Sequence, residues 1–235
     1  MTTVALIGVD GAGKTTIANK LLEMFPLPVK YIYMGLNIES SNYKLPTSRL
    51  ILYLKLRAIR KKAAQTGNTD PTFLTTHHVA HRKQKRGNIG TIFRTFNRFA
   101  EAWYRLIIAW FLQVRGYLVL YDRYFLFDMA PNVGQEAAQP LAEKAFYWTL
   151  THFYPEPDII IFLEAAPEVL FSRKQEVPVE YLARKTAAIL EQGKKMKNFV
   201  CVDAAQPIEQ VYADVTGHIM QFHTSGDVLK AFDAE

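Results

Sequence analysis

The residues with the clearest capacity for chemistry lie near the start of the chain. Gly8 is followed by four residues and then by Gly13, Lys14 and Thr15, which is the G-x-x-x-x-G-K-T spacing of a phosphate-binding loop. Glycines in such a loop allow consecutive backbone N–H groups to point at one spot. The lysine then reaches the β- and γ-phosphates of a nucleotide, and the threonine hydroxyl binds Mg²⁺. The spacing predicts a nucleoside triphosphate site that comprises Gly11, Ala12, Gly13, Lys14, Thr15 and Thr16.

A second group of polar residues follows the apolar run YLVLY at residues 117–121. It consists of Asp122, Arg123 and Tyr124. A carboxylate in such a place can hold the water shell of a metal ion or accept a proton, and a guanidinium can grip a phosphate through two hydrogen bonds. A local ion pair at the end of a strand is the alternative interpretation. Beside a phosphate-binding loop, the catalytic and metal-binding roles are favoured.

Short apolar runs alternate with amphipathic segments along the chain. The runs are continuous, as in ALIG, LVLY, IIIF and FVCV, which is typical of parallel strands buried on both faces. We therefore predict an α/β fold with a five-stranded parallel sheet and helices on both faces, the three-layer sandwich of P-loop NTPases. The strands are expected at residues 4–8, 29–34, 117–121, 158–163 and 199–202, and the helices at 17–25, 49–64, 92–114, 142–153, 167–173, 178–192 and 208–222. Ligands of such sheets bind beyond the carboxyl ends of the strands, where the loop and Asp122 are expected to meet.

Positive charge is concentrated in one part of the chain. The protein carries 28 Lys and Arg against 22 Asp and Glu, yet residues 41–100 hold 13 basic residues and a single acidic one. We predict one domain over residues 1–235 with a basic helical insert at about 41–100. Such an insert can steer polyanionic substrates, or it can be a solvated face.

Composition also indicates where the protein works. The sequence begins directly with a strand, and it has no apolar run of the ~20 residues that a membrane helix needs. The single cysteine, Cys201, lies in an apolar strand-like run, so we expect it to pack in the core in a reducing compartment. We expect a soluble, cytoplasmic protein without a membrane partner.

Four motifs together resemble those of thymidylate kinases. They are G-x-D-G-A-G-K-T-T at residues 8–16, D-R-Y at 122–124, P-D-x-x-I-x-L-E-x-x-P-E-V at 157–169 and V-D-A-x-Q-P-x-E-x-V at 202–211. The phosphate-binding loop alone is shared by many NTPases, whereas the combination in this order is selective. On these residues the chain is identified as a member of the thymidylate kinase-like P-loop kinases, in the nucleoside monophosphate kinase group. The resemblance omits the basic insert, which falls on the acceptor side.

The resemblance implies roles on the acceptor side. Asp10 would contact the sugar hydroxyl of the phosphate acceptor, and Arg123 would grip the acceptor's phosphate beside Tyr124. Two family positions that recognise the thymine base, a phenylalanine and an arginine four residues later, fall on Asn97 and Glu101 here.

Neighbouring residues could replace these base contacts. A slip by one turn would let Arg98 substitute, with Phe99, Trp103 and Arg105 nearby. The family's R-E-P-G after the second strand is replaced by residues 34–37. The motifs on the ATP side are present. The residues that differ from the family all lie on the acceptor side, so the sequence does not identify the acceptor.

On the donor side the resemblance implies a lid and an adenine site. The lid is short and lies at about residues 173–180, where Arg173 would close on ATP; Lys174 adjoins it and Arg184 is a more distant candidate. Ala204, in the loop after the last strand, would lie near the adenine.

These observations give one prediction of function with two alternatives. The prediction is an ATP- and Mg²⁺-dependent transfer of the γ-phosphate to a nucleoside monophosphate such as dTMP. The first alternative is the same chemistry on a modified nucleoside, a sugar or glycan hydroxyl, or a polynucleotide end, which the basic insert would favour. The second is a nucleotide-dependent nucleic-acid-binding module without phosphate transfer; a salt-dependent shift on DNA or RNA without turnover would favour it.

The predicted residues fall into three groups. The catalytic residues are Lys14, Asp122, Arg123 and Arg173; Mg²⁺ is held by Thr15 and Asp122; the acceptor contacts are Asp10, Arg98, Arg123 and Tyr124. A stripe of Trp103, Trp110 and Phe111 is expected in the core or in a homodimer face, since kinases of this family commonly pair through that helix.

Overall fold

The fold is taken from a computed structural model, which describes residues 2–35, 41–66, 88–129 and 141–232. The chain forms two compact units. The first comprises Met1–Tyr43 and Arg105–Glu235, and the second comprises Lys44–Tyr104. Most of the basic segment at residues 41–100 therefore falls in the second unit.

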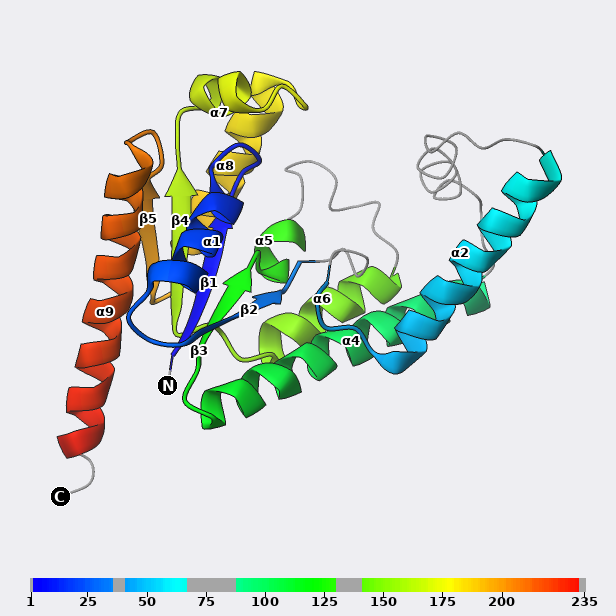
Figure 1. The fold of residues 1–235 in the computed structure, drawn as a ribbon, viewed down its shortest axis with the longest axis horizontal. Coiled ribbons are helices and arrows are strands. Elements are labelled where there is room, and N and C mark those ends of the chain that lie inside the picture. Colours follow the sequence, from blue (N-terminus) through cyan, green and yellow to red (C-terminus); the bar gives the residue numbers. More distant parts are fainter. Residues whose placement is uncertain (1, 36–40, 67–87, 130–140, 233–235) are drawn as a thin grey trace. The chain divides into compact units, whose positions relative to one another are not determined.

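The first unit is built on the predicted five-stranded sheet (Figure 1). Its strands are β1 (Thr3–Gly8), β2 (Val29–Tyr33), β3 (Leu118–Asp122), β4 (Ile159–Glu164) and β5 (Phe199–Asp203). The order is β2-β3-β1-β4-β5, and every neighbouring pair is parallel. Leu6 of β1 lies opposite Asp122 of β3 in this register. The carboxyl ends of β1 and β3 therefore meet at the switch point of the sheet, where open parallel sheets bind their ligands.

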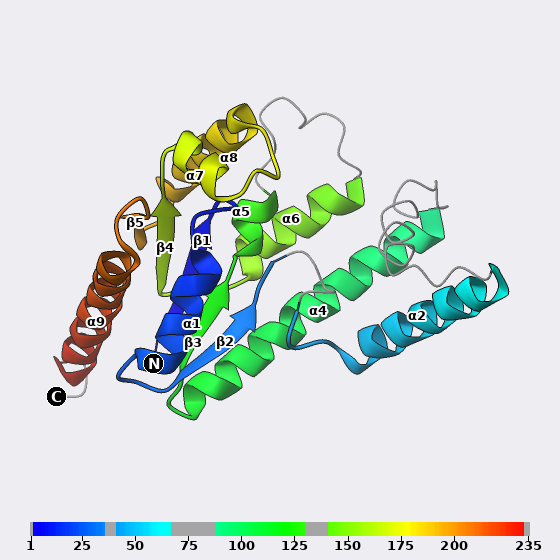
Figure 2. The same ribbon diagram turned by 45° about the horizontal axis from the view of Figure 1, so that its top comes forward.

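Helices cover the sheet on both faces (Figures 1 and 2). They are α1 (Lys14–Met24), α5 (Phe125–Met129), α6 (Leu141–Phe153), α7 (Pro167–Arg173), α8 (Val179–Gly193) and α9 (Ile208–Phe232). On one face α1 packs against α9, and Lys20 pairs with Glu209 at 3.3 Å. On the other face Phe127 of α5 stacks on Phe199 of β5, beside Gly193 of α8. The three-layer arrangement predicted from the sequence is confirmed.

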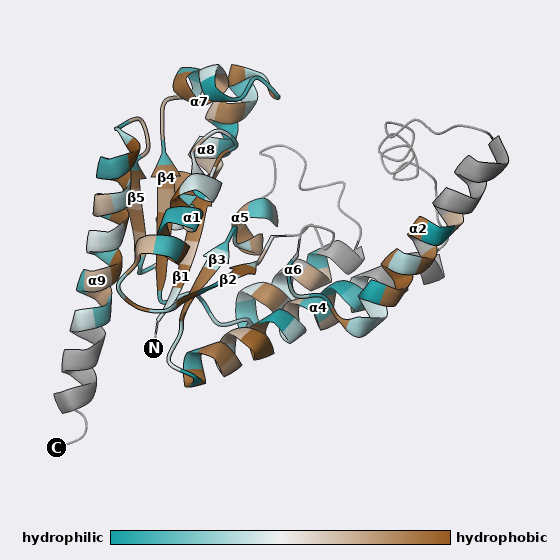
Figure 3. Cartoon of the chain, in the orientation of Figure 1, coloured by the Kyte–Doolittle hydropathy of each residue, from teal (hydrophilic) through white to brown (hydrophobic). Residues whose placement is uncertain are grey.

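The central strands supply the core. Val4, Ala5 and Leu6 of β1 are fully buried, as are Ile161 and Phe162 of β4. Hydrophobic colours run along β4 and β5 in Figure 3. Because helices cover both faces, consecutive residues of a central strand are buried, which explains the continuous apolar runs of the sequence.

The second unit contains α2 (Pro46–Thr66) and α4 (Asn88–Val114) as far as Tyr104. The fully buried Glu101 accepts a hydrogen bond from the backbone N–H of Leu45 at 3.0 Å. The side chains of Ser48 and Asn97 exchange hydrogen bonds at 2.9 and 3.2 Å. These bonds fix the start of α2 to α4.

Three features differ from the sequence-based expectations. The last helix, α9, continues to Phe232, because no proline interrupts residues 208–232. Cys201 is exposed and not in the core, since β5 is an edge strand. The short helix α5 adds to the predicted elements. Among the residues that the structure describes, no helix has the length and apolar character to cross a membrane.

Candidate active site

The predicted phosphate-binding loop joins β1 to α1. Gly11 and Gly13 have φ angles of 91° and 84°, in the left-handed region that glycine tolerates. A Cβ atom at position 11 would also lie 2.7 Å from the carbonyl oxygen of Leu170 in α7, so a side chain there has no room. Gly13 provides no side-chain cap for α1. The first N–H groups of the helix therefore remain available for an anion.

The remaining loop residues divide between core and surface. Ala12 is buried, whereas Thr15 and Thr16 are exposed in the first turn of α1. The hydroxyl of Thr15 is therefore accessible at the predicted phosphate and metal site.

Lys14 is folded onto the loop that it follows. Its buried Nζ donates hydrogen bonds to the carbonyl oxygens of Gly8 and Val9, both at 2.9 Å, and lies 4.0 Å from a carboxylate oxygen of Asp10. Burial, reinforced by the positive charge of Arg123, lowers the pKa of Lys14 to about 8. A phosphate bound nearby would favour the ammonium form of Lys14 and raise its pKa again. The lysine therefore lies where the charge of a phosphate would stabilise it.

Asp122 ends β3 beside the loop. Its Oδ2 accepts a hydrogen bond from the Tyr31 hydroxyl at 2.6 Å. Its Oδ1 is buried and has no hydrogen-bond partner among the described residues. Burial, followed by the hydrogen bond to Asp122, raises the pKa of Tyr31, so this tyrosine stays a donor. This oxygen could therefore bind a metal ion or a metal-bound water next to the phosphate-binding loop.

Arg123 has a strained backbone and a fixed side chain. Its φ angle is 65°, the left-handed region that residues with a Cβ rarely adopt. The backbone N–H donates to the carbonyl oxygen of Leu6 at 3.1 Å. The guanidinium pairs with Asp10 at 3.0 Å and with Asp128 of α5 at 3.7 Å.

The two carboxylates determine the charge of this network. Burial acts to lower the pKa of Arg123, but Asp128 and Asp10 outweigh it, so the pKa rises. Burial likewise acts to raise the pKa of Asp10, but Lys14 and Arg123 lead the cations that lower it overall. Arg123 and Asp10 are therefore both charged at neutral pH.

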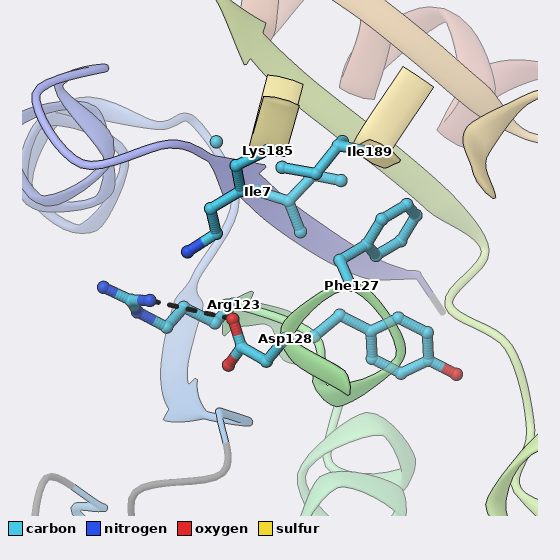
Figure 4. A pocket seen from close by; sticks show the side chains of 8 residues that line it. Ile7, Arg123, Phe127, Asp128, Lys185 and Ile189 are labelled. Atoms are coloured by element: carbon cyan, nitrogen blue, oxygen red, sulfur yellow. Dashed lines mark ion pairs between the residues drawn. The ribbon is translucent and has the colours of Figure 1, made fainter. Parts of the chain in front are cut away.

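A pocket opens between the end of β1, the Asp-Arg turn and α8 (Figure 4). Its lining residues are Ile7, Gly8, Arg123, Tyr124, Phe127, Asp128, Lys185 and Ile189. The side chains of Ile7, Phe127 and Ile189 lie at one end, and those of Lys185 and Arg123 extend toward the other. The pocket thus has an apolar end and a charged end that adjoins the phosphate-binding loop.

The structure brings Arg173 and Ala204 together. Nη1 of Arg173, the last residue of α7, donates a hydrogen bond to the carbonyl oxygen of Ala204 at 2.8 Å. Ala204 is buried, and its N–H donates to the carbonyl oxygen of Glu164 at 2.6 Å. In this conformation Arg173 holds the loop after β5, although the sequence suggested a lid arginine directed at ATP.

Tyr124 is a buried residue that also lines the pocket. Its side chain is fully buried, and its hydroxyl lies 3.5 Å from the carbonyl oxygen of Pro155. Its ring packs against Phe125, with centroids 4.7 Å apart. Tyr124 is thus buried while it also lines the pocket, and its role as an acceptor contact stays a prediction.

The predicted base-recognition region also has structural uses. Arg105 is buried and donates hydrogen bonds to the carbonyl oxygens of Tyr33 and Gly35 at 3.0 and 3.1 Å. Asn97 and Glu101 fix the start of α2, as described above. Arg98 lies on the part of α4 that belongs to the second unit, so its role toward the acceptor stays a prediction.

Three residues of the site have no signal in the motifs. Tyr31 orients Asp122, Asp128 pairs with Arg123, and Lys185 lines the pocket. Alternation along β2 could have placed Tyr31 on one face of the sheet. Asp128 and Lys185 come from helices whose packing no local pattern encodes.

The fold and the site together define a class of protein. A parallel sheet, a glycine-rich loop with a buried lysine between β1 and α1, and an Asp-Arg pair at the end of the neighbouring strand are the parts of a P-loop phosphate-binding protein.

Comparisons with known proteins narrow this class. No family model matches the chain. The chain is 25% identical to a probable thymidylate kinase of Archaeoglobus fulgidus, over 93% of this chain and 95% of that relative. It is 24% identical to a probable thymidylate kinase of Sulfurisphaera tokodaii, over 88% and 90%, and 25% identical to a probable thymidylate kinase 1 of Saccharolobus solfataricus, over 88% and 91%.

One solved structure gives a weaker likeness. A deoxyadenosine kinase from M. mycoides aligns with 93% of this chain at 14% identity and a TM-score of 0.47, which is too low to carry a conclusion. The three relatives, each matched over nearly the whole chain, confirm the resemblance that the motifs indicate. The chain is thus similar to thymidylate kinases over nearly its whole length, and its loop and sheet are those of a P-loop fold.

Proposed function

We propose that this protein transfers the γ-phosphoryl group of ATP to a nucleoside monophosphate, with Mg²⁺ as the metal and dTMP as the leading acceptor. The observation that carries the proposal is the direct link between the two halves of the site. Asp10 of the phosphate-binding loop is paired at 3.0 Å with Arg123, the arginine at the end of the neighbouring strand. A donor cradle and an acceptor cation are thus joined in one network. The relatives, named as probable thymidylate kinases, support dTMP as the first acceptor to test.

The donor phosphates would bind in the loop between β1 and α1. The uncapped N-terminus of α1 offers N–H groups to the phosphate oxygens. Lys14 would turn from the carbonyl oxygens of Gly8 and Val9 toward the β- and γ-phosphates. Exchanging two neutral acceptors for anionic oxygens strengthens its hydrogen bonds and favours its protonated form.

The residues around the loop fit a magnesium ion of the kind that kinases use. Asp122 carries a buried oxygen without a partner among the described residues, and Thr15 has an accessible hydroxyl in the first helical turn. The described residues contain no cluster of three or more His, Cys, Asp or Glu that could hold a metal. Asp122 and Thr15 suit Mg²⁺, which is commonly held by one or two protein ligands together with phosphates and water. When bound, Mg²⁺ would neutralise charge on the phosphates.

The acceptor phosphate would bind at Arg123. Its guanidinium is shared between Asp10 and Asp128, and a dianionic phosphate competes well for an arginine because it accepts two parallel hydrogen bonds. Asp10, once displaced, would be placed to accept a hydrogen bond from the acceptor's sugar hydroxyl. The acceptor oxygen then forms a bond to the γ-phosphorus while the bond from that phosphorus to ADP breaks. A dianionic phosphate acceptor has no proton to give up, so this transfer needs no general base.

The adenine would lie near Ala204. Arg173 holds the carbonyl oxygen of Ala204, so it would shape the adenine loop in the conformation described here. Closure of the lid on ATP would require Arg173 to leave that carbonyl. Arg98 is retained as a proposed contact to the acceptor base.

An acceptor screen tests the proposal. Purified protein with ATP and Mg²⁺ is assayed for ADP release against dTMP, other nucleoside monophosphates, nucleosides, simple sugars and short oligonucleotides. Strong stimulation by dTMP or another monophosphate is expected, and the Lys14→Met variant serves as the inactive control. Stimulation by nucleosides, sugars or oligonucleotides alone would contradict a monophosphate acceptor while leaving the kinase class in place.

A further inference from the structure

Lys185 is a cation at the site that the motifs do not include. It lies on α8, is half-buried, and lines the pocket together with Gly8, Arg123 and Asp128. Figure 4 shows its side chain extending toward the same end of the pocket as the guanidinium of Arg123. Gly8 is the last residue of β1 before the phosphate-binding loop. The lysine therefore reaches the site from the helix opposite the loop.

The charges around Lys185 indicate an anion between them. Lys185 contributes to lowering the pKa of Asp10 and also to lowering the pKa of Lys14, so it acts on both sides of the network. The two carboxylates nearest to Arg123, those of Asp10 and Asp128, are already paired with it. Lys185 and Arg123 extend toward the same end of one pocket, and two cations so placed repel one another unless an anion lies between them. Phosphoryl groups in transit carry the negative charge that such a constellation stabilises.

The cations of the predicted lid have other partners. Arg173 donates to the carbonyl oxygen of Ala204 at 2.8 Å, and Lys174 pairs with Glu176 at 3.1 Å. Among the residues that line the pocket, Lys185 is thus the cation that comes from α7 or α8. Lys185 lies on α8, which is part of the first unit, so no closure of the lid is needed to bring this lysine to the pocket.

We propose that Lys185 is a catalytic residue that binds the γ-phosphate of ATP and follows it during transfer to the acceptor. The proposal rests on the proposed function. The bond from the γ-phosphorus to ADP breaks and a bond to the acceptor oxygen forms, while Lys185 keeps its protons and only neutralises charge on the equatorial oxygens.

A binding experiment tests Lys185 without needing the acceptor. Calorimetry with Mg²⁺ compares a non-hydrolysable ATP analogue with ADP on the wild type, Lys185→Met, Lys185→Arg and the control Lys194→Met, an exposed lysine at the end of the same helix. Methionine keeps the length of the stem and removes the charge. Loss of one charged hydrogen bond should weaken the analogue at least about tenfold in Lys185→Met and leave ADP nearly unchanged, because ADP lacks the γ-phosphate. Lys185→Arg should keep most of the preference for the triphosphate.

The outcomes separate this inference from the proposed function. Equal preference for the triphosphate analogue in Lys185→Met and Lys194→Met overturns the role of Lys185, whatever the acceptor is. With an acceptor from the screen, kcat of Lys185→Met should fall about 100-fold with little change in the acceptor's KM. If the screen finds no turnover, the proposed function fails and the binding result still decides on Lys185. Lys185→Gln repeats the comparison should the methionine variant melt at a lower temperature.

Discussion

In the first unit, the amino ends of the strands form one edge of the sheet and their carboxyl ends form the other. Polar groups at these two edges differ in how fully they are hydrogen-bonded. At the amino edge, β1 and the residue before β4 are joined by a closed set of hydrogen bonds. The N–H and hydroxyl of Thr3 donate to Asp158 at 2.7 and 2.8 Å, and the N–H of Asp158 donates back to the Thr3 oxygen at 2.9 Å. At the carboxyl edge, Asp122 keeps a buried oxygen without a partner among the described residues, Arg123 has a left-handed backbone, and Lys14 has a lowered pKa.

This difference indicates that residues at the amino edge stabilise the fold, whereas residues at the carboxyl edge form the site. Buried polar groups that find all their partners within the chain stabilise the fold. Buried charges and strained residues destabilise it and persist where a ligand completes their surroundings. The same strands carry both, since β1 begins at Thr3 and ends at Gly8. Substitutions at the carboxyl edge should therefore change activity, and substitutions at the amino edge should change stability.

The largest effect is expected at Lys14. Replacement by methionine removes the cation that would stabilise the β- and γ-phosphates, so kcat should fall at least about 1000-fold. The melting temperature should stay the same or rise, because a buried charge is replaced by an apolar side chain. Steady-state kinetics and thermal denaturation measure the two quantities. A variant that unfolds but loses no activity per folded molecule would contradict the assignment.

Arg123 should show the next largest effect, confined to the acceptor. Lysine at this position keeps a charge but loses the fork that binds two phosphate oxygens at once. We expect the kcat/KM for the acceptor to fall about 100-fold and the affinity for ATP to change little. Acceptor titrations at saturating ATP, with calorimetry for ATP alone, make the comparison. An equal loss of ATP binding would place Arg123 on the donor side.

A substitution at the amino edge should reverse the pattern. Thr3→Val keeps the shape of the side chain and removes the oxygen that both donates to and accepts from Asp158. Leaving the N–H of Asp158 unpaired should lower the free energy of unfolding by about 2 kcal/mol. Activity per folded molecule should be that of the wild type. Denaturant unfolding and kinetics check both, and a selective loss of kcat would break the division between the edges.

The sequence could predict the parts of the molecule that local patterns encode. Continuous apolar runs revealed the parallel strands, and the glycine and lysine spacing revealed the loop. Tyr124 shows the limit, because it follows Arg123 in the motif yet points into the core after the left-handed turn at Arg123. The left-handed backbone of Arg123 changes the direction of the chain, so Tyr124 is buried although Arg123 is not.

Other misses depend on tertiary packing. Arg105 lay at a plausible distance from the acceptor site in sequence, but two backbone carbonyls at the end of β2 bind it. Lys185 belongs to the pocket only because α8 lies opposite the phosphate-binding loop. Neither fact follows from periodicity, which assigns a residue to a helix face but does not identify the groups packed against that face.

The last expected effect is the pH dependence of stability, and one measurement compares the two edges. The pKa of Lys14 is about 8 in the folded protein and 10.5 ordinarily. Between these values the unfolded chain binds more protons than the folded one, so the free energy of unfolding gains with rising pH from this residue, by at most about 1.4 kcal/mol per pH unit. Below pH 8 lysine is charged in both states, and the full cost of its burial remains.

Lys14→Met lacks this titration, so its stability advantage over the wild type should shrink as the pH rises from 8 to 10. Thr3→Val has no titrating group at the changed position, so its deficit relative to the wild type should stay constant over the same range. Denaturant unfolding of the three proteins at several pH values gives both differences. A constant gap between Lys14→Met and the wild type would mean that Lys14 is not held in the buried, partly desolvated position from which it would have to turn toward the phosphates.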